Sequence, residues 1–507
     1  MTAAVSGAEV MDKNLSPYNL LEENWIPVLG TDGSYCRLSI KGTLMQSGRI
    51  RQIATSNPMD RLAIFRFLLA LLYWCQGNPP PDMDAGLCRD GFPVDWFAKL
   101  DDDRECFNLL GEGGRFYQYR KEGDKPLSVN YLLQEVPTGT NMWHFRHSTD
   151  GVNGLCRACC AMGLLRLPVF STSGGKGKSP GINAKPPVYV VPLGETLRDT
   201  LRLAWKPVTN LGKPCWLQPS LPLPNRGELP LLTGLTWLPR RVWLEDRSAP
   251  ESECISCGRR EGLIRRCVFA GLGTSKAPGR TWCDPHVVYV QKGNDLMPFQ
   301  TADALVARDA AAGHWAALLA AVLRDARFTA KLAQGIPAMA EGGFNVRLWI
   351  VAFSTVRNDK YLEAAETCLP VPQQALLSGT SDEAVRLEQW HGLRNGLART
   401  LTRRLEETRG QTASRENLIV ESLASAIRPH VEGRVVAKAG ELLSGGIEVW
   451  QRAAREYEPM MNLIAGPLAP GYTTKALLRR RRIAGTIPSL QTEPAARKSR
   501  RKQREDQ

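Results

Sequence analysis

The sequence lacks the short motifs that mark most common enzyme classes. It has no H-E-x-x-H zinc-hydrolase pair, no G-x-x-x-x-G-K-[ST] phosphate loop, no G-x-S-x-G nucleophile turn and no glycine-rich dinucleotide fingerprint. Histidine is scarce, with six in 507 residues, and beyond the pair His144 and His147 the histidines form no metal-ligand pattern. The acid run Asp101–Asp103 is typical of a solvated loop. The sequence therefore predicts a protein that binds rather than catalyses.

Long apolar runs are missing as well. The most hydrophobic stretch, Leu62–Cys75, is interrupted by Arg66 and is shorter than the roughly 20 residues that a membrane-spanning helix needs. The first residues, MTAAVSGAEVMDKN, contain no apolar segment of the kind found in secretory signals. The 13 cysteines are odd in number and follow no even spacing, which favours reduced thiols and a metal site over disulfides. We therefore expect a soluble, cytoplasmic protein with no membrane contact.

Positive charge is present in excess. Lysine and arginine number 65 against 51 aspartates and glutamates, which gives a formal net charge of +14 and a pI of about 9.3. An excess of this size indicates a polyanionic partner such as nucleic acid. Residues 471–507 contribute much of it, with eleven lysines and arginines and three acids. This end of the chain is either a solvated, disordered segment or a direct nucleic-acid contact.

The spacing of apolar residues changes along the chain. It predicts a buried helix over about 59–75 and another helix over about 301–332. Between about 141 and 300, short apolar runs alternate with connections rich in glycine and proline, which predicts strands and long loops. The apolar run Val346–Phe353 suits either a strand or a helix, and the polar residues Ser354–Lys360 after it suit a loop.

Strand signals disappear in the last third of the sequence. Helical segments separated by short, mostly glycine-containing breaks predict antiparallel helices there. The predicted fold class is α+β, with a large mixed α/β domain over 1–375, a four-helix bundle over 376–487 and a basic, disordered tail over 488–507. A hydrophobic content of 43% in 507 residues is enough for more than one domain.

Two C-x-x-C pairs carry the clearest chemistry in the sequence. Cys156 and Cys159 form the first pair, and Cys254 and Cys257 form the second. Four thiolates are the tetrahedral ligand set of a structural zinc, and such a closed set leaves no position for a substrate. Gly258 would let the backbone turn tightly after the second pair. The sequence therefore predicts a zinc ion that joins two distant segments.

Two alternatives to this zinc site stay open, because the pairs lie much farther apart than in a compact zinc ribbon. The first is that the two pairs are unrelated buried thiols. The second is that another nearby side chain replaces one of the four ligands. The candidates for such a replacement are Cys160, Cys283 and His286.

Four segments follow one another in a distinctive order. They are NLLEENWIPV at 19–28, HFRHSTDG at 144–151, FSTSGGKGKSPGIN at 170–183 and TWCDPH at 281–286. In this order they resemble the opening strand region, the L1 loop, the glycine-rich loop and a later landmark of the CasA family. Members of that family are the large subunits of type I-E CRISPR surveillance complexes (Cascade). The helical last third matches the family's bundle in size and position, so the resemblance covers nearly the whole chain.

The resemblance implies a function. A CasA-like subunit docks at the end of a guide RNA–protein filament and reads the protospacer-adjacent motif (PAM) of double-stranded target DNA, largely through the minor groove. It helps to open the duplex, guides the displaced strand and presents a surface to the helicase–nuclease. The implied partners are the CRISPR guide RNA, the target DNA, this effector and the backbone, small and 5′-end subunits. Target sequence is left to guide pairing.

The resemblance also assigns PAM-reading residues. The backbone of the glycine-rich loop would approach the groove wall, and its lysines would contact phosphates or base edges. The residues of this loop are Gly174, Gly175, Lys176, Gly177 and Lys178. Lys276 corresponds to the family's minor-groove lysine, with Arg280 as the alternative. A solvated loop without a nucleic-acid role is the other interpretation of these glycines and lysines.

Three further sets of residues receive roles in the same way. Asn358 corresponds to the wedge that splits the duplex, with Arg357 and Lys360 beside it, although this loop departs from the family's amide-rich pattern and could simply be a polar turn. In the L1 segment, Phe145, Arg146 and His147 would contact the guide RNA or a neighbouring subunit, with burial of Phe145 as the alternative. The arginines expected to follow the displaced strand, or else to form a solvated helix face, are Arg394, Arg399, Arg403, Arg404, Arg479 and Arg480.

Two other functions compete with this interpretation. A zinc-containing nucleic-acid-processing enzyme or nuclease subunit would need an acidic metal cluster or a general base near the basic surface, and the sequence offers none that we can assemble. A standalone DNA-binding regulator would usually carry a recognisable reading helix. Neither accounts for the order of the four segments.

Overall fold

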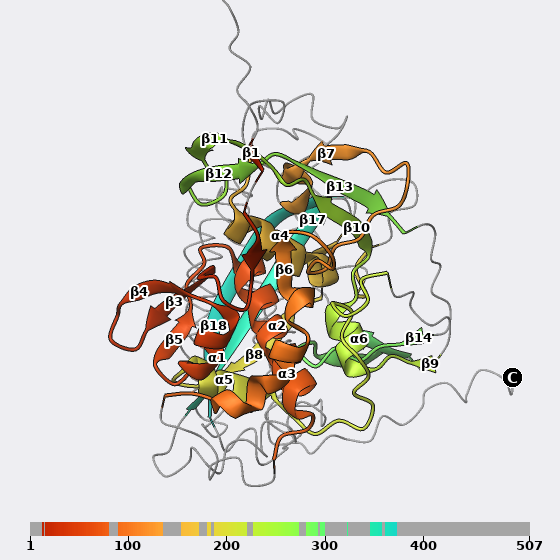
Figure 1. Cartoon of the computed structure of the whole chain (residues 1–507). Coiled ribbons are helices and arrows are strands. Elements are labelled where there is room, and N and C mark those ends of the chain that lie inside the picture. Colours follow the sequence, from red (N-terminus) through yellow and green to blue (C-terminus); the bar gives the residue numbers. More distant parts are fainter. Residues whose placement is uncertain are drawn as a thin grey trace, which may run out of the picture. The chain divides into compact units, whose positions relative to one another are not determined.

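The computed structural model describes most of the first three hundred residues and a strand pair beyond them (Figure 1). The described residues are 13–14, 16–80, 90–134, 154–171, 180–183, 187–220, 227–272, 280–292, 295–299, 322, 345–356 and 360–372. Apart from 322 and 370–372, they belong to one compact unit. The predicted bundle and tail lie outside the described residues, as does the helix expected over 301–332 except for residue 322. The mixture of helices and strands agrees with the predicted α/β character of the first domain.

Helices and strands alternate irregularly along this part of the chain. The helices are α1 (Ile40–Met45), α2 (Pro58–Gln76), α3 (Ala98–Asp102), α4 (Arg157–Phe170), α5 (Leu197–Ala204) and α6 (Leu231–Thr236), with 3-10 turns η1 (Val94–Phe97), η2 (Arg104–Phe107) and η3 (Val129–Leu132). The strands are β1 (Lys13–Asn14), β2 (Tyr18–Asn19), β3 (Ile26–Gly30), β4 (Tyr35–Leu38), β5 (Ile50–Ile53), β6 (Asn108–Leu110), β7 (Pro126–Ser128), β8 (Tyr189–Leu193), β9 (Gly227–Glu228), β10 (Arg240–Leu244), β11 (Arg247–Glu253), β12 (Arg260–Ile264), β13 (Arg266–Gly271), β14 (Arg280–Thr281), β15 (Tyr289–Lys292), β16 (Asp295–Pro298), β17 (Asn345–Val356) and β18 (Lys360–Pro372).

Helix α2 is the centre of the core. Asn57 caps it by accepting a hydrogen bond from the backbone N–H of Met59, and Pro58 takes the first position, where its missing N–H costs nothing. Every residue from Leu62 to Tyr73 is buried, and α4, α5 and α6 pack against the helix (Figure 1). The buried helix predicted over 59–75 is confirmed. No helix in the described part of the chain is both long and apolar enough to cross a bilayer.

Helix α4 corrects the prediction of strands and loops over 141–300. Its side chains from Ala158 to Phe170 are all buried, so the sequence has no polar face and no helical period to detect. Gly163 and Pro168 lie inside it, and both residues normally argue against a helix. Pro168 is tolerated near the end of the helix, and burial against α2 and η3 outweighs the weak local propensity. Helices α5 and α6 are further departures from that prediction.

The sheets of the described residues are small. The short pair β9 and β14 is parallel, whereas the pairs within the β4-β3-β5, β10-β13-β7 and β1-β11-β12 sheets and the pairs β17-β8, β2-β6 and β15-β16 are antiparallel. Their strand orders are β4-β3-β5, β10-β13-β7, β1-β11-β12, β18-β17-β8, β2-β6 and β15-β16. Strand β17 settles the open choice for Val346–Phe353 in favour of a strand. The loop predicted over Ser354–Lys360 is wrong at both ends, because β17 continues to Val356 and β18 begins at Lys360. The alanines and glutamates of β18 have low strand propensity, which explains why the sequence did not reveal this strand.

Candidate metal centre and nucleic-acid interface

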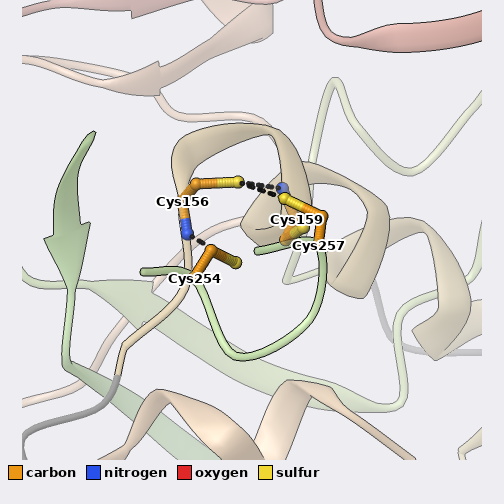
Figure 2. Close-up of side chains that lie close together, drawn as sticks. All are labelled: Cys156, Cys159, Cys254 and Cys257. Atoms are coloured by element: carbon orange, nitrogen blue, oxygen red, sulfur yellow. Dashed lines mark hydrogen bonds between the residues drawn. The ribbon is translucent and has the colours of Figure 1, made fainter. Parts of the chain in front are cut away.

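The two C-x-x-C pairs come together in the structure, although they are about a hundred residues apart in sequence (Figure 2). Cys156 and Cys159 lie at the start of α4, and Cys254 and Cys257 lie in the turn that joins β11 to β12. The four Sγ atoms are all within 4.8 Å of one another. Tetrahedral zinc with Zn–S bonds of about 2.3 Å would hold its sulfur atoms about 3.8 Å apart, and Sγ of Cys156 is 3.7 Å from Sγ of Cys257. The four thiols therefore fit a metal of this size.

Backbone groups around the cluster favour thiolates. Cys156 is the N-cap of α4, and its Sγ accepts a hydrogen bond of 3.4 Å from the N–H of Cys159. The N–H of Cys156 donates to Sγ of Cys254 over 3.3 Å. Gly258 follows the second pair with φ +70°, a conformation that favours glycine, and its N–H donates to the carbonyl of Cys254 over 2.8 Å. The tight turn predicted at Gly258 is therefore confirmed.

The four thiols influence one another's pKa values. Hydrogen bonds from the thiols of Cys156 and Cys159 lower the pKa of Cys254 to about 6 and also lower the pKa of Cys257. The pKa of Cys159 is raised, because its thiol bonds to Cys156, Cys254 and Cys257 and is also largely buried. Hydrogen bonding within the cluster therefore favours thiolate character at Cys254 and Cys257, and a bound cation would displace the thiol protons that remain.

The alternative ligands are not part of the cluster. Among the described residues, these four cysteines are the one group of ligand side chains close enough to share a metal. Cys160 is buried one turn into α4, and its Sγ lies 3.9 Å from the carbonyl oxygen of Leu155. Cys283 is exposed, and His286 contacts Arg66 elsewhere in the core. The structure therefore brings together the four cysteines that the sequence predicted as ligands, Cys156, Cys159, Cys254 and Cys257.

Most of the predicted nucleic-acid contacts lie outside the described residues. Lys360 is the first residue of β18, and Arg280 is the first residue of β14. The remaining contacts stay predictions from the sequence; they are Gly174, Gly175, Lys176, Gly177, Lys178, Lys276, Arg357, Asn358, Phe145, Arg146, His147, Arg394, Arg399, Arg403, Arg404, Arg479 and Arg480. The structure does describe the residues that flank three of these segments.

The described residues on either side of the glycine-rich segment lie next to each other. It follows α4, whose last residue is Phe170, and the N–H of Gly181 donates to the carbonyl of Ser171 over 2.7 Å. Both ends of the segment are thus bonded to each other. The residues between them therefore begin and end at neighbouring points of the described structure.

The far end of this segment is bonded to residues that follow the segment containing Lys276. The carboxamide of Asn183 accepts a hydrogen bond of 3.0 Å from the indole N–H of Trp282. Because an indole N–H can only donate, this bond fixes the orientation of the amide, and its NH2 group faces Asp284 and Tyr189. Nδ2 lies 2.8 Å from Oδ2 of Asp284 and 3.3 Å from the hydroxyl oxygen of Tyr189. Asn183 therefore connects two predicted DNA-contacting segments.

A buried ion pair anchors the same residues to α2. Two guanidinium nitrogens of Arg66 donate to the two carboxylate oxygens of Asp284 over 2.7 Å and 2.9 Å, and both side chains are almost fully buried. Nη1 of Arg66 is also 3.0 Å from Nδ1 of His286, which must accept because a guanidinium only donates. Burial alone would raise the pKa of Asp284, but the charge and hydrogen bonds of Arg66 hold that pKa below its usual value.

The strand that leads to the predicted wedge packs beside this network. Phe353, near the end of β17, packs against Phe170 with ring centroids 4.7 Å apart and against Tyr189 at 6.4 Å. Tyr189 opens β8, and its ring also lies 6.1 Å from that of Phe170. In the register of β17 on β8, Val351 is opposite Tyr189. The described flanks of the glycine-rich segment, of the Lys276 segment and of residues 357–359 therefore converge on one cluster of residues.

Sequence reasoning missed this cluster, although one signal was present. Arg66 interrupts the most apolar stretch of the chain, and a charge that is buried on a helix needs an opposite charge and hydrogen bonds. Asp60, on the same helix, is buried against Arg166 of α4 in the same way, with oxygen–nitrogen distances of 2.5 and 2.8 Å. The partner of Arg66 lies 218 residues away in sequence, and no local pattern identifies it.

Comparison with known proteins gives the family. Residues 19–457 match the family described as CRISPR-associated protein Cse1 (CRISPR_cse1). The chain belongs to this family. A protein of Thermus thermophilus described as CRISPR-associated protein CasA/Cse1 is 30% identical over 252 residues. The resemblance to the CasA family is therefore confirmed.

The structural matches cover more of the chain than the sequence alignment does. The alignment with the T. thermophilus relative covers 46% of this chain and 50% of that relative's length. The structure of T. thermophilus CasA (Cse1) matches with a TM-score of 0.68 at 21% identity, over 92% of this chain and 98% of the other. A chain from a CRISPR RNA-guided surveillance complex matches with a TM-score of 0.61 at 18% identity, over 92% and 99%. At these identities the two structures show that the fold is shared.

Proposed function

We propose that this Cse1 family member is the large subunit of a type I-E CRISPR surveillance complex. In this role it recognises the PAM of double-stranded target DNA, assists duplex opening and R-loop formation, guides the non-target strand and recruits the helicase–nuclease. It acts as a DNA-binding subunit, not as an enzyme. Its partners are the guide RNA and the backbone, small and 5′-end subunits of the complex.

One observation carries this proposal. The described flanks of three separate segments, each predicted to contact DNA near the PAM, converge on Phe170, Tyr189, Asn183 and the Arg66–Asp284 pair. A PAM is a few base pairs long, so the groups that read it and split the duplex next to it must act within a short distance of one another. The family match over residues 19–457 and the fold shared with a surveillance-complex chain support the same conclusion.

The metal that fits this centre best is zinc, in a structural role. Four thiolates in tetrahedral reach are the ligands that zinc prefers, and they occupy all its positions. The zinc would join the start of α4 to the β11–β12 turn. Both segments belong to the domain that carries the predicted PAM-reading loops, and the far end of α4 leads into the glycine-rich segment. Metal binding would thus stabilise the helix from which that segment starts.

The test is duplex binding by a reconstituted guide-RNA complex, with and without this chain, on targets with intact and scrambled PAMs. We expect tight binding when both the chain and an intact PAM are present, and weak binding when either is absent. A chain that fails to join the complex, or that leaves binding unchanged, contradicts the proposal. Divalent-metal-dependent cleavage of nucleic acid by the purified chain would instead support the alternative of a zinc-containing nuclease subunit.

Replacing Lys276 with alanine should weaken PAM recognition. The loss of one base-edge or phosphate contact in the minor groove is expected to reduce affinity for the intact-PAM duplex by about tenfold. Replacing Gly174 and Gly175 together with bulky residues should have a similar effect, because a side chain would hold the backbone away from the groove. Equilibrium binding of the reconstituted complex measures both effects. Lys121→Ala, at an exposed lysine, is the matched control, and unchanged affinity in both test variants would refute the site.

A further inference from the structure

Asn183 occupies an unusual position between two segments that are far apart in sequence. It follows the glycine-rich segment, and its side chain bonds to Trp282 and Asp284, which follow the segment that contains Lys276. Its partners in turn are fixed. The Tyr189 hydroxyl lies 3.3 Å from Nδ2 of Asn183, and the carboxylate of Asp284 is held by Arg66. One carboxamide thus links residues that follow both predicted reading segments.

The surroundings hold the partners of Asn183 in one geometry. A Cβ atom added to Gly234 of α6 would lie 2.0 Å from the ring of Trp282, so the indole rests directly on that helix backbone. The hydroxyl of Tyr289 accepts from the N–H of Asp284 over 2.9 Å and donates to the carbonyl of Trp282 over 3.2 Å. The N–H of His286 donates to Oδ1 of Asp284 over 2.9 Å. Trp282 and Asp284 therefore form a fixed support to which the side chain of Asn183 is bonded.

We propose that Asn183 is a positioning residue that couples the glycine-rich segment to the Lys276 segment, so that the two read the PAM as one unit. The inference rests on the proposed function and names the residue that sets the specificity of that site. Two loops that moved independently would each pay an ordering cost on binding, and each would accept a range of groove positions. A shared carboxamide lowers that cost and makes a contact by one loop depend on the position of the other.

The experiment measures the PAM discrimination ratio, the affinity for an intact-PAM duplex divided by the affinity for a scrambled one, in the reconstituted complex. Asn183→Ala removes the bonds to both Trp282 and Asp284, and it should lower the ratio about tenfold. Trp282→Phe removes the indole donor and keeps a ring against Gly234, and it should lower the ratio by a smaller factor. The double variant should be no worse than Asn183→Ala alone, since both changes break one shared bond.

The controls separate positioning from folding. Asn78→Ala changes an exposed asparagine whose amide also makes two hydrogen bonds, both to the backbone of Val208, and it should leave the ratio unchanged. Assembly into the complex and the melting temperature of each variant show whether the fold is retained. A ratio that stays at the wild-type value in both Asn183→Ala and Trp282→Phe overturns the inference alone. A wild-type complex that does not discriminate between the two duplexes overturns the proposed function, and the inference with it.

Discussion

Replacing Cys254 and Cys257 together with serine is expected to reduce bound zinc from about one ion per chain to none and to lower the melting temperature. Two ligands remain in the variant, and two thiolates cannot hold zinc in competition with water. Since the free energy of metal binding is part of the free energy of folding, the loss destabilises the domain. Elemental analysis and thermal unfolding measure the two effects. A strong chelator should lower the melting temperature of the wild type and leave that of the variant unchanged.

The matched control for this prediction is Cys36→Ser, which changes an exposed cysteine outside the cluster. It should retain the metal and the wild-type melting temperature. Cys160→Ser tests the alternative ligand and should also retain the metal. Native protein that contains no zinc, or a serine variant that binds as much as the wild type, would contradict the predicted site.

Breaking the buried ion pair between Arg66 and Asp284 is expected to cost about 3–5 kcal/mol of unfolding free energy. Asp284→Asn keeps the size of the side chain but leaves the Arg66 guanidinium without a counter-charge in the core. Urea unfolding at neutral pH measures the loss. Arg66→Met combined with Asp284→Asn should cost less than the sum of the two single changes, because the double variant leaves no unpaired charge.

An exposed ion pair provides the comparison. Arg104 donates to both carboxylate oxygens of Glu22, and both side chains are at least half exposed. Glu22→Gln should cost less than about 1 kcal/mol. If Asp284→Asn costs no more than Glu22→Gln, the Arg66 pair does not stabilise the core as proposed.

The dependence on pH follows from the lowered pKa of Asp284. A carboxyl group whose pKa is lower in the folded state stabilises the protein above its unfolded pKa of about 3.9. That contribution is lost as the pH falls through the lower folded value. The difference between wild type and Asp284→Asn should therefore be constant from about pH 7 to 5 and should shrink below about pH 4.

The sequence alone could predict the features that local chemistry determines. The buried helix over 59–75 has its start signal in Asn57-Pro58 and an apolar residue at nearly every position. The four clustered cysteines are recognisable because C-x-x-C is a local pattern typical of metal sites. The order of short landmarks along the chain was enough to give the family.

What the sequence could not predict depends on contacts between distant residues. Helix α4 has no polar face and contains Pro168, so its helical state comes from burial against α2. Strand β18 has residues of low strand propensity, and it is a strand because β17 lies beside it. The partner of Asn183 is an indole 99 residues away. Each of these features is fixed by tertiary structure, which a scan along the chain does not see.

The hydrogen bond between Gly181 and Ser171 has a consequence for how freely the sequence between these residues can vary. Because the two ends of the glycine-rich segment are bonded to each other, the residues between them can change in length and composition without disturbing α4 or β8. The sequence between Ser171 and Gly181 can therefore be replaced as a unit. Under the proposed PAM-reading role, such changes would give related proteins new recognition sequences while the buried network around Arg66 and Asp284 stays the same.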